Sequence, residues 1–136
     1  MLSTEKALFK DLAGPIEELR WGEFVIGGET HSGVAEERVG KGKDIRVIGR
    51  KVSRWKERQG HRLDPSMITG IYGQRVDVLV IGNGIDGAVW VPDEVRQDIS
   101  NHGIELIVKP TAIACRIYNE LYHKGKRVAL LAHGTC

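Results

Sequence analysis

The sequence predicts an α/β domain with parallel strands in its second half and a β-hairpin near its start. Three apolar runs, residues 76–81, 104–108 and 128–131, alternate with two amphipathic stretches. Strands that alternate with helices pair in parallel through right-handed crossovers. In the first half, extended segments flank the pair Gly27-Gly28, which is a hairpin signal.

The N-terminal half reads as short strands and loops. Residues 1–14 are predicted to be an extension, either a short helix or a mobile end, before a single domain over residues 15–136. The hairpin takes residues 21–26 and 29–32, and the polar residues 35–44 form a loop. A short strand over residues 45–48 breaks at Gly49 and resumes over residues 51–55.

A short helix is predicted after Leu63, because Asp64 suits an N-cap and Pro65 suits the first helical position. It runs through Met67 and ends near Gly73.

The second half is more regular. Residues 76–81 are nearly all β-branched or aliphatic, as in a central strand buried on both faces. Pro92 opens a helix that turns Val95 and Ile99 inward and ends at Gly103. Thr111 caps a second helix, which Gly125 ends, with an apolar stripe of Ile113, Ala114, Ile117, Tyr118, Leu121 and Tyr122. The last strand spans residues 128–131, and its direction stays open.

Composition bounds the function. A chain of 136 residues with a formal charge of +2 fits one domain that has no strong overall attraction to nucleic acid or membrane. Residues 1–37 hold three basic and eight acidic side chains, whereas residues 43–62 hold eight basic and two acidic ones. No apolar run reaches membrane-spanning length. Both cysteines are expected to be reduced thiols, Cys115 in the core and Cys136 at the end, so a cytoplasmic protein is expected.

Several blocks of the sequence are similar to a family of small α/β domains of largely unknown function. That family includes the adipogenesis-associated domain protein of animals and mitochondrial complex I assembly factor 3. The blocks span roughly residues 15–136: Trp21-Gly22, Gly27-Gly28, Trp55, Gly60-His61-Arg62-Leu63, Gly82-Asn83-Gly84, Pro92, Gly103-Ile104, Thr111, Ala114, Tyr118-Asn119, Leu121, Gly125, Arg127, Val128 and Ala129. Asn83 departs from the Thr or Ser of many members. The resemblance implies a three-layer sandwich with a mixed, largely parallel central sheet, and it supplies no catalytic residue.

One candidate binding site lies around Gly82, Asn83 and Gly84. If the three C-terminal strands are parallel, this turn, Thr111 and residues 133–134 line one crevice, where open α/β sheets bind ligands. Thr111 would help to hold an anion, or it is only a helix cap. The letters of residues 82–87 match the dinucleotide fingerprint, but no helix begins within them, so a plain turn is the better interpretation and no cofactor is expected.

Among the five histidines, His61 is the one to test first as a binding residue. The histidines do not show metal-binding spacing, so no metal is expected. We also find no Ser-His-Asp, Cys-His or paired-carboxylate arrangement that indicates catalysis.

The basic segment predicts an interaction surface that contains Arg50, Arg54, Trp55, Arg58 and Arg62. A basic surface with an aromatic residue can stack nucleobases, but an acidic protein partner or a second copy of the chain fits better.

The sequence thus favours a non-enzymatic accessory or protein-interaction domain that resembles an assembly factor. The alternative is a small-molecule or anion-binding domain, with or without enzymatic activity, that uses the crevice at Gly82–Gly84 and Thr111.

Overall fold

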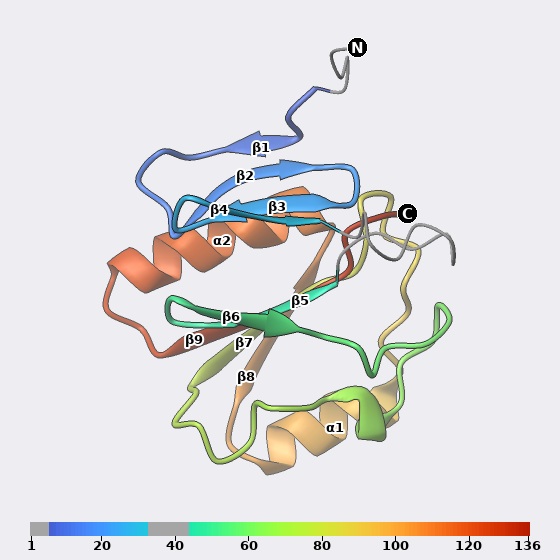
Figure 1. Ribbon diagram of the computed structural model, residues 1–136. Coiled ribbons are helices and arrows are strands. Elements are labelled where there is room, and N and C mark those ends of the chain that lie inside the picture. The colour runs from blue at the N-terminus through green and yellow to red at the C-terminus, as the bar shows by residue number, and fades with distance from the viewer. Residues whose placement is uncertain (1–5, 33–43) are drawn as a thin grey trace.

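The computed structural model describes residues 6–32 and 44–136. In these ranges it contains a four-stranded sheet, a five-stranded sheet and two α-helices (Figure 1). The strands of the small sheet follow the chain: β1 (Phe9–Lys10), β2 (Ile16–Arg20), β3 (Glu23–Ile26) and β4 (Glu29–Ser32). The five-stranded sheet has the order β6-β5-β9-β7-β8. The predicted α/β class, mixed sheet and N-terminal hairpin are confirmed.

The predicted hairpin is the β3–β4 pair, in which Ile26 lies opposite Glu29. Gly27 and Gly28 have φ of 58° and 81°, the left-handed backbone that a two-residue hairpin turn requires. Phe9 and Lys10 form β1 against β2 instead of a short helix. The domain boundary after residue 14 stays a prediction.

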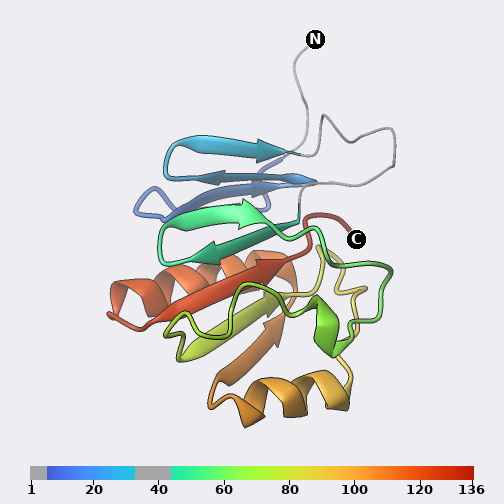
Figure 2. The same cartoon turned by 60° about the horizontal axis from the view of Figure 1, so that its bottom comes forward.

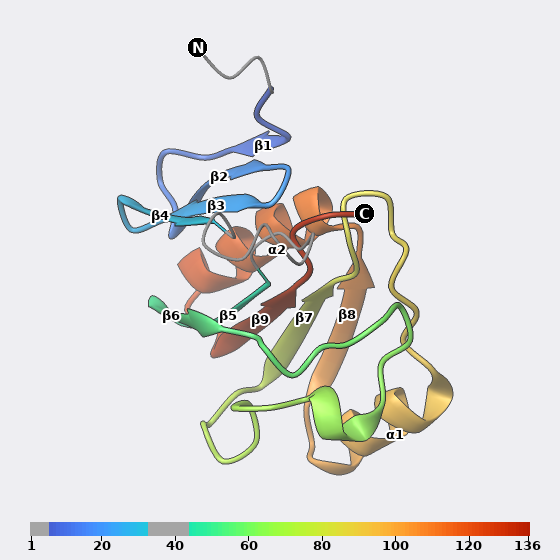
Figure 3. The ribbon, with the colours of Figure 1, turned by 45° about the vertical axis from the view of Figure 1, so that its right-hand side comes forward.

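The five-stranded sheet is parallel at its centre. Here β7 (Val78–Gly82) lies between β9 (Val128–Ala132) and β8 (Glu105–Lys109), and both pairs are parallel. Every residue of β7 and β9 is buried, as the apolar runs predict. Figure 3 shows the arrowheads of the three strands directed toward the end of the molecule that holds the C label. The direction of the last strand, left open by the sequence, is therefore parallel to β7.

The antiparallel part of this sheet is a hairpin of β5 (Ile45–Ile48) and β6 (Lys51–Arg54). The sequence analysis expected the strand to break at Gly49 and continue. Instead the chain reverses there, because Gly49 takes φ 61° and Ile48 pairs with Lys51. After β6, Asp64 accepts a hydrogen bond from Ser66 N at 2.8 Å and caps the 3-10 helix η2 (Pro65–Met67). This helix is shorter than predicted.

The two α-helices cover opposite faces of the five-stranded sheet. On one face α1 (Asp93–Asn101) packs near β8 and η2, with Val95 and Ile99 buried as predicted. On the other face α2 (Thr111–His123) packs on β7 and β9 and also contacts β1 and β2 of the small sheet. Figure 2 shows α1 alone on its face, away from α2.

One buried polar residue of α2 ties this helix to the small sheet. Asn119 is 1% exposed and its side chain accepts from Ile16 N at 3.0 Å and donates to Ile16 O at 2.8 Å. It also donates to Asp11 Oδ2 at 2.9 Å. The predicted apolar stripe did not include Asn119, and it did include Ile113, which is 39% exposed.

Candidate functional site

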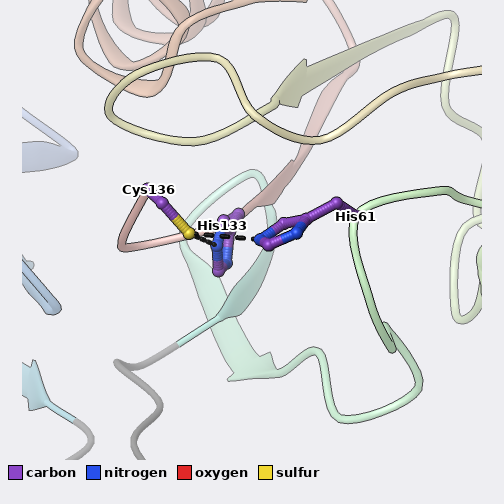
Figure 4. A group of neighbouring side chains, drawn as sticks. All are labelled: His61, His133 and Cys136. Atoms are coloured by element: carbon purple, nitrogen blue, oxygen red, sulfur yellow. Dashed lines mark hydrogen bonds between the residues drawn. The ribbon is translucent and has the colours of Figure 1, made fainter.

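Three side chains with metal-binding and nucleophilic chemistry meet beyond the carboxyl ends of the parallel strands. They are His61, His133 and Cys136 (Figure 4). Cys136 Sγ lies 3.3 Å from Nε2 of His61 and 3.3 Å from Nε2 of His133. The three ligand atoms all lie within 4.8 Å of one another. The sulfur therefore sits between two imidazole nitrogens.

The last strand carries two of these residues to the site. His133 follows β9 directly, and its main-chain N donates to Gly82 O at 2.9 Å, which extends the pairing with β7. Thr135 O then accepts from Ile85 N at 2.9 Å, and Cys136 O accepts from Asp86 N and Ala88 N at 3.0 and 3.2 Å. The segment after β9 is thus bonded along the loop that leaves β7.

His61 comes from the loop between β6 and η2. Its carbonyl accepts from Trp90 N at 2.7 Å, and Trp90 O accepts from Leu63 N at 3.0 Å. Leu63 is fully buried, which anchors this stretch. The main chain at His61 is therefore held, while its imidazole is exposed and directed at Cys136 (Figure 4).

A largely covered carboxylate orients the second imidazole. Asp44 Oδ1 lies 2.8 Å from Nδ1 of His133 and also accepts from Gly134 N at 3.3 Å. Its other oxygen is ion-paired with the Nε of Arg58, and Arg58 also donates to Gly60 O. An ionised carboxylate can only accept, so Nδ1 of His133 carries a hydrogen, and in the neutral ring Nε2 presents its lone pair toward the sulfur.

Thr111 and Gly84 hold the segment that contains Cys136. The Thr111 hydroxyl donates to His133 O at 2.8 Å and accepts from Gly84 N at 3.0 Å. Gly84 has φ 110°, and a Cβ there would lie 2.6 Å from the carbonyl carbon of Cys136. Thr111 is fully buried and is the first residue of α2, after the N-cap Pro110, so it is neither the predicted cap nor open to an anion.

The predicted convergence of the strand ends is thus confirmed, but the crevice between them is filled. Residues 134–136 lie against Gly84, and a Cβ at Gly82 would lie 3.0 Å from Oγ1 of Thr111. Asn83 Oδ1 is buried and has no hydrogen-bond partner within the residues described. The chain after Gly87 reaches α1 without a helix among the glycines, consistent with a plain turn.

The predicted interaction surface divides into exposed and buried residues. Trp55 is 1% exposed, and its indole donates to Met67 O at 2.7 Å. Arg58 is 7% exposed because it pairs with Asp44. These two residues lie beneath the surface, which corrects the prediction for them. The exposed members are Arg50, Arg54 and Arg62, the last lying 4.7 Å above the ring of Trp90.

The other cysteine and two of the other histidines lie in surroundings that explain them by packing or hydrogen bonding. Cys115 is in the core as predicted, and burial raises the pKa of its thiol. His102 stacks on Tyr72 at 3.5 Å, and His123 bonds to Gly14 O at 2.7 Å. These groups have partners away from the sulfur of Cys136.

His61 could be picked out from the sequence, but the group around it could not. No Cys-His arrangement was predicted, whereas the structure places His133 and His61 against Cys136 and adds Asp44 behind them. Asp44 and His61 lie far along the chain from His133 and Cys136, so no local spacing contains the whole set. One feature of the sequence could have indicated the site. His133 and Cys136 are three residues apart and directly follow the last predicted strand, which was expected to end beside the Gly82–Gly84 turn.

Comparison with known proteins identifies the family. A family model described as "Protein of unknown function (DUF498/DUF598)" matches residues 16–133. The chain belongs to this family. Solved structures share the fold of this DUF498/DUF598 chain. A conserved hypothetical protein of Pyrococcus horikoshii is 28% identical with a TM-score of 0.73, over 89% of this chain and 98% of that one.

Two bacterial structures show the same fold at lower identity. An outer membrane protein of Bartonella henselae has a TM-score of 0.72 at 19% identity, over 96% of this chain and all (100%) of that one. A Bordetella pertussis protein described as a Mth938-like domain has a TM-score of 0.62 at 15% identity, over 98% and 92%. Within residues 6–32 and 44–136 of this chain, no helix is long and apolar enough to cross a membrane.

Proposed function

We propose that this chain is a non-enzymatic accessory protein that binds a transition metal of the zinc class. The ligands are Nε2 of His61, Nε2 of His133 and Sγ of Cys136. The observation that carries the proposal is the meeting of two imidazole nitrogens at one sulfur, each at 3.3 Å. Imidazole and thiolate together suit zinc and copper better than magnesium or calcium.

The spacing supports a tetrahedral ion. Typical zinc–sulfur and zinc–nitrogen bonds separate a sulfur ligand from a nitrogen ligand by about 3.6 Å. Both sulfur–nitrogen distances here, at 3.3 Å, are near that value. The ligand nitrogens lie within 4.8 Å of each other, and the exposed ring of His61 has room to close on an ion. Three protein ligands leave one position for water or another ligand.

The surroundings of His133 support the same conclusion. Metal-binding histidines commonly donate their other N–H to a carboxylate, which fixes the tautomer and the ring. Asp44 does this at 2.8 Å, and Arg58 and Gly134 hold the carboxylate. Gly84 and Thr111 hold the segment that carries His133 and Cys136, and neither residue belongs to the proposed ligand set.

Cobalt binding tests the proposal, because tetrahedral Co²⁺ with a thiolate ligand gives a near-ultraviolet charge-transfer band. We expect the band in the unaltered protein, its loss in Cys136→Ser, and weaker binding in His61→Ala. His31→Ala and Cys115→Ser are matched controls, since both residues lie outside the cluster. The absence of the band, or equal Co²⁺ affinity in Cys136→Ser, would overturn the proposal. Competition with Zn²⁺ then ranks the two metals.

A second candidate function is thiol chemistry, which the chain Asp44–His133–Cys136 favours. In such an arrangement the imidazole takes the thiol proton and the carboxylate orients the imidazole. The metal proposal explains the contact of His61 with the sulfur as well, whereas thiol chemistry uses one imidazole. Alkylation of Cys136 by iodoacetamide separates the two. Zn²⁺ should protect the thiol if it binds there, and His133→Ala should slow alkylation in the presence of a chelator if His133 is the base.

The accessory role also rests on the resemblance to an assembly factor and on the uneven charge. We propose a second copy of this chain as the partner of the exposed basic residues Arg50, Arg54 and Arg62, and a cytoplasmic location that keeps Cys136 reduced. Sedimentation at low and high salt tests the partner. Arg54→Glu with Arg62→Glu should lower any self-association, and a protein that is monomeric at all salt concentrations would refute it.

A further inference from the structure

A concave site lies at the opposite end of the five-stranded sheet from the candidate metal site. The pocket has a volume of about 560 Å³ and lies where β7 and β9 begin, beside the turn between β5 and β6 and the end of α2. In Figure 1 these elements are on the left, whereas the C label marks the other end. The pocket shares no residue with the candidate metal site, so the inference is independent of the proposed function.

The pocket has an apolar base and an aromatic wall. Val76 and Val128 are buried beneath it at 8% and 2% exposure, and Ile48 completes the base. Tyr122 lines the side and is covered by the guanidinium of Arg50, 5.8 Å from its ring centre. A pocket with such a base and a few polar groups at its rim is typical of small-molecule sites.

The rim is positively charged, and its cations come from separate segments. Arg75 precedes β7, Lys126 and Arg127 precede β9, and Arg50 adjoins the pocket from the β5–β6 turn. Among the residues that the structure describes, the pocket lining contains no Asp or Glu. Acidic residues of the neighbouring segments include Asp77, which pairs with Arg127 at 2.9 Å, Glu105, whose main-chain N donates to Asp77 O at 2.9 Å, and Glu17, whose charge acts on Arg50. Positive charge therefore exceeds negative charge around the opening.

The C-terminus of α2 explains only part of this charge. Helix C-termini favour cations, which accounts for Lys126 near the end of α2. Arg75 is not on that helix. It has φ 57° and is the only non-glycine residue with positive φ in residues 6–32 and 44–136. Such a backbone is strained for a long side chain, and strained residues gather at binding sites.

We propose that this pocket binds a small organic phosphate with an apolar or aromatic body. The planar fork of Arg75 pairs with the phosphate, assisted by Lys126, because guanidinium matches phosphate oxygens in a bidentate geometry. The apolar body lies on Val76, Val128 and the ring of Tyr122. Both halves of the ligand are needed, since the rim recognises charge and the base recognises apolar surface.

Titration with phenyl phosphate, followed by amide chemical shifts, tests the proposal. We expect perturbation around Arg75, Tyr122 and Lys126, and at least tenfold weaker binding in Arg75→Gly. Glycine accepts the left-handed backbone, so this variant removes the guanidinium without harming the fold. Arg116→Gln is the matched control, because Arg116 is exposed on α2 and does not line the pocket.

Two further ligands dissect the site. Phenol should bind far more weakly than phenyl phosphate because it lacks the charge, and inorganic phosphate should bind more weakly because it lacks the ring. Cys136→Ser should bind phenyl phosphate normally, which separates this result from the fate of the metal proposal. The proposal is overturned if phenyl phosphate does not bind at millimolar concentration, if Arg75→Gly binds it equally well, or if phenol or inorganic phosphate matches it.

Discussion

At the scale of single residues, the candidate metal site depends on a glycine that contacts no ligand atom. Gly84 lets the chain after β9 pass close to the loop after β7, because a Cβ at Gly84 would lie 2.6 Å from the carbonyl carbon of Cys136. The backbone of Gly84, at φ 110°, is also one that side chains rarely adopt.

Gly84→Ala should therefore weaken metal binding without removing any ligand. We expect Co²⁺ affinity to fall at least tenfold, because residues 135–136 must move away from the new methyl group. Gly60→Ala is the matched control, since Gly60 also has positive φ, at 65°, precedes His61, and has open space where its Cβ would lie. Both variants cost stability, but only Gly84→Ala displaces Cys136. Equal Co²⁺ affinity in the two variants would show that the close approach of Gly84 is irrelevant to the site.

The buried pair of Asp44 and Arg58 makes a second prediction. Their side chains are 11% and 6% exposed, so loss of Arg58 would leave a nearly buried carboxylate without its partner. Arg58→Met should lower the free energy of unfolding by about 3–5 kcal/mol, measured by urea denaturation. The double variant Asp44→Asn with Arg58→Met should recover part of this loss. A single variant as stable as the unaltered protein would contradict the assigned pairing.

At the scale of elements, the hydroxyl of Tyr118 joins α2 to the β5–β6 turn. Tyr118 is fully buried and its OH donates to Gly49 O at 2.6 Å. Burial raises the pKa of Tyr118 far above its usual range near 10. Burial and the neighbouring Asp98 raise the pKa of Tyr72 as well. Both side chains stay protonated in the folded protein under conditions that ionise them in the unfolded chain.

This difference predicts a loss of stability in alkali. The contribution of a group whose pKa is raised by folding is fully present below its unfolded pKa of about 10 and is lost as pH rises above it. Urea denaturation between pH 8 and pH 11 should show the loss. Tyr118→Phe should cost about 1 kcal/mol at neutral pH, because Gly49 O loses its donor, and should make the alkaline decline shallower. Identical pH profiles of the two proteins would contradict this assignment.

Sequence patterns predicted the helices and strands well where the apolar pattern extended over many residues. The strands around Val80, Ile107 and Leu130 and the helices around Val95 and Ala114 all form. Short elements were harder, because one glycine can interrupt a strand or reverse it. Gly49 reverses the chain, and the basic segment that looked like a solvated surface folds Trp55 and Arg58 inward.

The site could be predicted only in part. Parallel strands bring Gly82, Thr111 and His133 to one edge, and that edge was predicted from the order of the elements. The contact of His61 with Cys136 depends on how the loop after β6 folds back along Trp90. No periodicity or residue spacing in the sequence indicates the path of such a loop. The contact between His61 and Cys136 could therefore not be predicted from the sequence.

At the scale of the whole molecule, the metal site joins segments that are far apart in the chain. His61 lies in the loop before η2, and Cys136 follows β9. The turn between β2 and β3 also reaches this region, because Gly22 N donates to Gly134 O at 2.6 Å. An ion held by His61, His133 and Cys136 would therefore link the loop after β6 to the segment after β9, which the small sheet also contacts.

A metal that binds only the folded chain must raise the melting temperature. At a free Zn²⁺ concentration of 100 times the Kd, the stabilisation is about 2.7 kcal/mol, and a chelator should reverse it. Calorimetry of the unaltered protein and of Cys136→Ser, each with Zn²⁺ and with chelator, checks this. The shift should be absent in the variant. A shift of the same size in Cys136→Ser would place the zinc elsewhere.

Asn119 has a practical consequence for anyone who recombines members of this family. The side-chain amide of Asn119 forms hydrogen bonds with both the main-chain N–H and the carbonyl of Ile16, as a neighbouring β-strand would. A chimera that borrows the small sheet but takes its helix from a relative without asparagine at this position would bury two bare peptide groups. A chimera should therefore exchange the small sheet together with the helix that carries Asn119.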